Sequence, residues 1–220
     1  MRRIGLVVGA LGLVASSLAA QRYHRPGLRE VRERGSVGLT LHVAEPWGDF
    51  KRHGNMAAGL NVTGVSGGSG LGVRLEAAFL TYASDYQGYG ASTTSAIGSL
   101  GIGPQLTLGG GPLRVYGFAT LGGSLFWSSL DRDSCGCYDD DVFFLEGDFT
   151  TNRSVGAGLL LNVSSRLALD VGVREVRHDR VTYVPAGGIT ENSDGSYTVE
   201  RVETPVGMRV WHAGVSFAIR

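Results

Sequence analysis

The residues best suited to chemistry are five charged side chains that alternate with apolar residues along the chain. This spacing places them on one face of β-strands, because successive side chains of a strand point to opposite faces. Charged groups beside so many apolar residues must pair with each other, since an unpaired buried charge is costly. The set could therefore select ions, or it could form a structural network of ion pairs. Its members are Arg74, Glu76, Arg114, Asp170 and Arg174.

A second candidate is the acidic segment 128–147, whose carboxylates could hold Ca²⁺ through oxygen. Its spacing lacks the ordered Asp-x-Asp-x-Asp-Gly pattern of a calcium-binding loop, so a solvated acidic loop is the competing interpretation. The candidate ligands are Asp131, Asp133, Asp139, Asp140 and Asp141.

The same segment contains the only two cysteines, Cys135 and Cys137. With one residue between them, they could close a small, strained disulfide ring or remain thiols. A zinc site would need two further soft ligands, and no histidine or other cysteine lies nearby in the sequence. We therefore expect no metal and no cofactor, and the redox state of the pair stays open.

A catalytic triad would need a nucleophile, a base and an orienting carboxylate in one geometry. His42 and His212 fall on the polar faces of the first and last predicted strands, which must pair if the sheet closes, and Ser216 follows on the last one. That last strand, 206–219, holds no carboxylate that could orient the histidine. We therefore expect no enzymatic site.

Eight amphipathic segments carry these residues. In each of them apolar residues alternate with Gly, Ser, Thr and a few charged residues, a period that predicts β-strands. No apolar run of about 20 residues follows the N-terminal segment, so no membrane-spanning helix is expected. The predicted strands cover residues 37–43, 56–62, 71–79, 100–108, 113–127, 155–163, 167–173 and 206–219.

The connections between the predicted strands alternate in length. Short turns rich in Gly and Ser lie at 66–70, 109–112 and 164–166, and long connections lie at 45–54, 83–95, 128–149 and 178–205. Short turns at one end and long loops at the other are typical of barrels that span the outer membrane. Only 18% of the residues are charged, so the apolar faces are expected to meet lipid and the small polar faces a narrow lumen. The pattern predicts an all-β fold, an eight-stranded antiparallel up-and-down transmembrane β-barrel with short periplasmic turns and long extracellular loops.

The N-terminus is predicted to be a cleaved signal peptide covering residues 1–20. Arg2 and Arg3 precede an apolar run at 4–14, and small residues follow it. Without these two arginines the chain has 18 basic and 20 acidic residues, a net charge of −2. Residues 21–35 hold five Arg against two Glu and are predicted to be a basic periplasmic lead-in to the barrel at 36–220. Because the protein is exported, we expect no nucleic-acid partner.

The last predicted strand ends in a polar-x-Gly-x-x-apolar-x-apolar pattern formed by His212, Gly214, Phe217 and Ile219. This ending resembles the C-terminal signal by which the assembly machinery recognises outer-membrane β-barrels, although Arg220 follows where such chains usually stop on an aromatic residue. Together with the strand pattern and the turns, it makes residues 36–220 resemble the small eight-stranded outer-membrane barrels of the OmpA-like, OmpX-like and opacity-protein group.

The resemblance implies an outer-membrane location in a Gram-negative cell, with membrane lipid around the barrel and the assembly machinery as a partner during biogenesis. Side chains about fill the interior of an eight-stranded barrel. The five charged residues are therefore expected to form one network that plugs the lumen. Members of the group include anchors, adhesins and narrow channels, so the fold does not name the function. We expect a non-enzymatic structural or surface-interaction protein with an unknown surface ligand; a porin-like channel for small solutes and a lipid-modifying enzyme are the alternatives.

Overall fold

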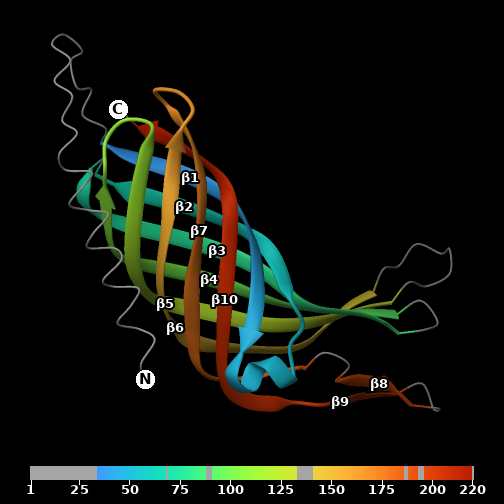
Figure 1. The fold of residues 1–220 in the computed structure, drawn as a ribbon. Helices are drawn as coiled ribbons and strands as arrows, with labels where there is room; N and C mark the ends of the chain where they lie inside the picture. The colour runs from blue at the N-terminus through green and yellow to red at the C-terminus, as the bar shows by residue number, and fades with distance from the viewer. Residues whose placement is uncertain are drawn as a thin grey trace, which may run out of the picture.

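The computed structural model describes residues 34–67, 69–87, 91–132, 141–185, 188–192 and 196–219. Within these ranges eight long antiparallel strands close into one barrel, and each strand pairs with its neighbours along the chain (Figure 1). The predicted fold class is therefore confirmed. The strands are β1 (Gly35–Trp47), β2 (Ala57–Ser66), β3 (Gly70–Gln87), β4 (Ala91–Leu108), β5 (Leu113–Arg132), β6 (Asp141–Asn162), β7 (Leu167–Tyr183) and β10 (Val202–Ile219).

The two ends of the barrel differ in the length of their connections (Figure 1). The short turns after β4 and β6 lie at the end where β10 finishes, and Gly109 and Gly111 in the first of them have φ angles of 99° and 84°. This left-handed region favours glycine. The other end carries a short 3₁₀ helix, η1 (Gly48–Arg52), and a hairpin of β8 (Ile189–Glu191) and β9 (Tyr197–Val199). We call these the turn end and the loop end.

The outer surface of the barrel is apolar. Side chains such as Leu41, Leu71 and Leu121 are 66%, 77% and 67% exposed, and equivalent residues surround the barrel on every strand. An apolar surface that surrounds the whole barrel is far larger than the apolar patches that monomeric soluble proteins expose. It matches the lipid-facing band of transmembrane barrels. The prediction that the apolar faces point outward is confirmed. No helix in the described ranges is long and apolar enough to cross a membrane.

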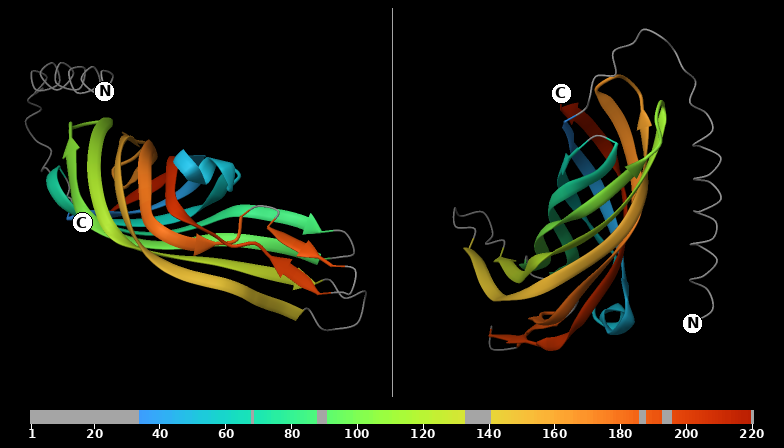
Figure 2. Two further views of the ribbon diagram at one scale, coloured as in Figure 1. Left: turned by 90° about the horizontal axis from the view of Figure 1, so that it is seen from below. Right: turned by 90° about the vertical axis from the view of Figure 1, so that its left-hand side faces the viewer.

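Four strands extend farther toward the loop end than the sequence predicts. β3 pairs with β4 as far as Gln87 opposite Ala91, and β5 pairs with β6 as far as Arg132 opposite Asp141. Most of the connections predicted at 83–95 and 128–149 are therefore strand, and β3 to β6 form a sheet that projects beyond the barrel (Figure 2). The prediction missed them because their faces need not alternate between lipid and lumen outside the membrane.

The barrel closes where β1 pairs with β10 along its whole length, from Gly35 opposite Ile219 to Trp47 opposite Gly207. Gly214 is required at this seam, since a Cβ atom there would lie 2.1 Å from the carbonyl oxygen of Leu39. A residue of the expected assembly signal is thus also a point of close backbone contact.

We expect Gly214→Val to prevent closure, because the added side chain would collide with rigid backbone. Gly64→Val is the matched control, since a Cβ atom at Gly64 meets nothing within 4 Å. Refolding each purified variant into lipid vesicles, without any assembly machinery, separates the steric effect from recognition of the signal. The heat-modifiable gel shift of a closed barrel should be absent in Gly214→Val and present in the control. A closed Gly214→Val barrel would contradict the steric account.

Candidate functional site

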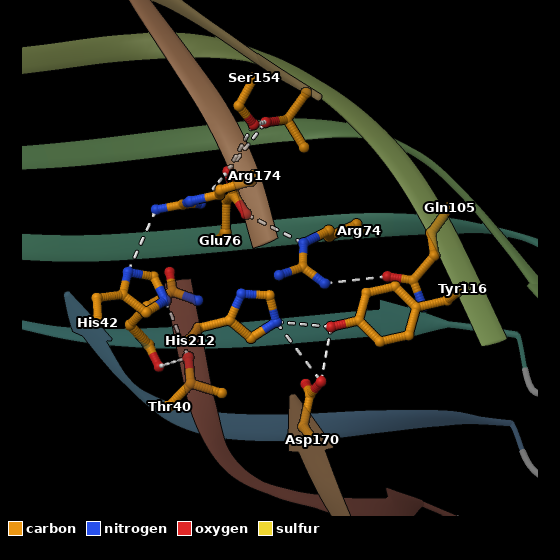
Figure 3. Close-up of polar contacts among 12 residues, drawn as sticks. Thr40, His42, Arg74, Glu76, Gln105, Tyr116, Ser154, Asp170, Arg174 and His212 are labelled. Atoms are coloured by element: carbon orange, nitrogen blue, oxygen red, sulfur yellow. Dashed lines mark hydrogen bonds and ion pairs between the residues drawn. The ribbon is translucent and has the colours of Figure 1, made fainter. Parts of the chain in front are cut away.

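An ion-pair cluster crosses the centre of the lumen. Glu76 of β3 lies 3.0 Å from Arg74 Nε and 2.9 Å from Arg174 Nη1, and all three side chains are almost fully buried. Because β3 and β7 stand on opposite sides of the barrel, the pair of Glu76 with Arg174 ties together walls that share no backbone hydrogen bonds (Figure 3).

Neighbouring strands hold the cluster in place. Thr120 Oγ1 donates a hydrogen bond of 2.9 Å to Glu76, and Arg74 Nη1 donates one of 3.0 Å to Gln105. The Arg74 guanidinium also lies 4.1 Å from the centre of the Phe118 ring, a favourable cation–π distance. Each charged group therefore has partners on more than one strand, which suits a structural role better than the binding of a mobile ion.

A second polar group lies nearer the turn end. The Tyr116 hydroxyl donates to Asp170 Oδ1 at 2.6 Å, and its oxygen is 2.8 Å from His212 Nε2. Since that hydroxyl proton is already donated, the histidine must donate to the tyrosine oxygen. His212 also faces His42 across the β1–β10 seam, with ring centres 5.8 Å apart, so the predicted proximity of the two histidines is confirmed.

Three of the five charged residues of the expected network pair directly with one another. Arg74, Glu76 and Arg174 lie together, whereas the contacts of Asp170 are with Tyr116 and His212. Arg114 donates to Asn162 at 2.9 Å near the turn end. Position along the strands explains the separation, because Asp170 lies four residues from Arg174, about 13 Å at the usual rise per residue.

A cluster of aromatic side chains lies in the lumen toward the loop end. Phe50 of η1 packs edge-on against Tyr82 and Tyr183 at ring distances of 5.6 and 5.2 Å, and Phe126 packs against His178 at 5.1 Å. These five residues are buried and we call them the plug. Sequence reasoning missed the plug because Phe50 falls in a predicted loop. Tyr82 and Phe126, however, continue the lumen-facing alternation of Glu76 and Ser124, a signal that could have found them.

Little space remains between the plug and the ion-pair cluster. A cavity between them, lined by Glu76, Asn152, Arg174, His178 and Met208 among others, has a volume of about 10 Å³. That is room for about one water molecule.

The remaining predicted residues fall in three places. Cys135, Cys137, Asp133, Asp139 and Asp140 lie outside the described residues, and for Asp131 and Asp141 only the backbone is described. His42, His212 and Ser216 are less than a tenth exposed, so they offer no open site at the membrane surface. Phe217 and Ile219 of the expected assembly signal are half exposed on the outer face at the turn end. No group of three or more metal-ligating side chains occurs among the residues that the structure describes.

We expect Glu76→Gln to lower the free energy of unfolding by about 3–5 kcal/mol, because it leaves two buried arginines without their counter-charge. The control is Glu175→Gln, which removes an exposed carboxylate 3.3 Å from Arg209 and should cost less than about 1 kcal/mol. Urea unfolding in lipid vesicles measures both. Equal effects would show that the cluster adds nothing to stability.

No protein-family model matches the chain, and no curated protein matches its sequence. Solved structures do match. The chain is 16% identical to Neisserial surface protein A with a TM-score of 0.51, and the match covers 86% of this chain and all of that one.

Two other matching structures have slightly lower TM-scores. Ail, the attachment invasion locus protein of Yersinia pestis, is 14% identical with a TM-score of 0.47, over 87% of this chain and 100% of Ail. A major outer membrane protein from Thermus thermophilus is 12% identical with a TM-score of 0.49, over 83% of this chain and 99% of that one. The chain thus has the fold of the small eight-stranded outer-membrane β-barrels.

Proposed function

We propose that the chain is a non-enzymatic outer-membrane protein whose closed barrel supports an extracellular sheet that binds a protein partner through its edges. The observation that carries the proposal is the unequal pairing of β6 with its two neighbours. β6 pairs with β5 from Asp141 onward, but with β7 only from Asn152.

Side chains bridge only part of the gap between β6 and β7. Asp148 accepts from the backbone N–H of Thr182 at 2.8 Å, and Thr150 donates to the carbonyl oxygen of Arg180 at 3.3 Å. Residues 141–147 therefore have no strand partner on that side within the described ranges. On the opposite edge of the projecting sheet, β3 pairs with β2 only as far as Thr81, so no described strand pairs with residues 82–87 on that side.

Unpaired strand edges present backbone N–H and C=O groups that an extended segment of another protein can pair with. The backbone supplies the affinity in this mode of recognition, and the flanking side chains supply the selectivity. An extracellular protein with an exposed or extended segment is the partner class that fits.

The filled lumen supports a structural rather than a transport role. The aromatic plug and the ion-pair cluster lie one above the other, and either one would obstruct the passage of water and solutes. The competing proposal, a narrow channel, draws on the buried polar atoms of Asn61, which have no hydrogen-bond partner in the structure and would need water.

We expect no steady single-channel steps from the wild-type protein or from Phe50→Ala in planar bilayers. The substitution removes part of the plug and should cost about 3–5 kcal/mol of stability, but the cluster of Glu76 beneath it remains. Steady steps from the wild type would favour the channel. Steps from Phe50→Ala alone would show that the plug is the sole barrier.

We also expect selection of random heptapeptides on the protein in lipid nanodiscs to yield sequences that bind its projecting sheet. The control is a shortened variant in which Asn-Gly turns replace residues 84–94 and 130–143. Selected peptides should not bind this variant. N-methylation of alternate peptide amides should weaken binding to the full protein by about 1 kcal/mol for each hydrogen bond lost. Peptides that bind both proteins equally, or that tolerate N-methylation at every position, would contradict edge pairing.

A further inference from the structure

The lipid-facing surface of the barrel carries a shallow apolar groove of about 640 Å³ that crosses β1 to β5. Exposed leucines form its sides, and glycines leave its floor low. At Gly64 a Cβ atom would meet nothing within 4 Å, so the groove is open there. At its other end, a Cβ atom on Gly123 would lie 2.5 Å from the Phe149 ring, so this ring borders the groove on the loop side.

The groove leads to an arginine without a partner. Leu121, at the β5 end of the groove, pairs in register with Arg153 of β6. Arg153 is exposed and lies on the loop-end side of the apolar outward-facing residues of β6, which it precedes in the chain, so it marks the point where that face leaves the hydrocarbon. Within the described ranges its guanidinium makes no ion pair and no hydrogen bond.

A second arginine faces the first. Arg177 of β7 is directly opposite Arg153, and like charges in this arrangement repel each other. Arg177 lies 4.8 Å from the centre of the Trp47 ring. Its ion pair with Glu175 is long, because the nearest nitrogen and oxygen atoms are 3.8 Å apart. An anion held between the two guanidinium groups would offset the repulsion.

Both arginines line a second groove of about 680 Å³ at the loop end, which has charged residues in its lining. Its charged lining consists of three arginines, with Arg180 as the third, and two aspartates, Asp49 and Asp179. Asp179 already accepts a hydrogen bond from Thr151. The groove is therefore formally positive by one charge, and it adjoins the apolar groove at Arg153.

We propose that the two grooves together hold one phosphorylated lipid of the outer leaflet, with an acyl chain in the apolar groove and the phosphate between Arg153 and Arg177. Arginine forks bind phosphate oxygens in pairs, and lipid phosphates lie just outside the hydrocarbon, at the height where the outward-facing charges begin. The apolar groove also runs the right way, from Leu121 down to Val37 near the turn end of β1. The acyl chains of a lipid in the outer leaflet point in the same direction, from the loop end toward the turn end.

Native mass spectrometry of the detergent-solubilised protein tests the site, with phosphatidic acid as the probe and diacylglycerol of the same chains as its uncharged counterpart. We expect one tightly bound phosphatidic acid and about hundredfold weaker binding of diacylglycerol, because the loss of the phosphate removes its charge-assisted contacts with both arginines. Arg153→Gln should weaken the binding of phosphatidic acid about tenfold, because it removes one charge-assisted contact. Gly64→Leu, which fills the apolar groove, should weaken both lipids.

Two matched controls accompany these variants. Arg166→Gln removes an exposed arginine at the turn end, and Ala157→Leu enlarges an exposed, lipid-facing residue of β6 outside the groove. Both should bind like the wild type. The proposal is wrong if Arg153→Gln and Arg166→Gln bind alike, or if diacylglycerol binds as well as phosphatidic acid. It is also wrong if inorganic phosphate displaces the lipid and Gly64→Leu has no effect, because the site would then be an anion site without an acyl chain. None of these outcomes depends on the extracellular partner.

Discussion

Backbone pairing inside the hydrocarbon is the constraint on which this structure depends. A lipid environment offers no water to an unpaired N–H or C=O group, so a sheet that crosses it must close on itself. The seam between β1 and β10 provides this closure over the whole length of β1. Closure with eight strands also makes the interior narrow, and the packing of the lumen follows from that width.

Narrowness explains why glycine and arginine occur together on the inner face. A Cβ atom at Gly101 would lie 3.2 Å from the Glu76 side chain, and one at Gly156 would lie 2.7 Å from Arg174 Cβ. The missing side chains therefore make the space in which the long charged groups cross the lumen. Burial removes most of the solvation of these groups, so they need partners among the other side chains of the lumen. The ion-pair cluster thereby links strands that the backbone ladder leaves unconnected.

The parts of this arrangement that follow a period of two could be predicted from the sequence. Strand number, turn lengths and the outward direction of the apolar faces depend on alternation and turn chemistry alone, so the residues reveal them. The pairing of His42 with His212 could be predicted as well, since closure forces the first and last strands together. The contacts between the charged residues could not be predicted, because strand tilt and stagger set the relative height of Asp170, Arg114 and Glu76 in the lumen. The position of Phe50 could not be predicted for a different reason. A loop that folds back into the lumen has no periodic sequence pattern that would indicate it.

The same constraint accounts for where the barrel opens. On the adjacent strands β6, β7, β10 and β1 the outward face changes from apolar to charged at Arg153, Glu175, Arg209 and Glu45, respectively. Beyond that level water can hydrogen-bond the backbone, and closure is no longer obligatory. The β6–β7 pairing begins at Asn152, directly beside Arg153, and above it the two strands separate. The edge of the projecting sheet and Arg153, both without a partner among the described residues, thus arise at one boundary, the level at which lipid gives way to water.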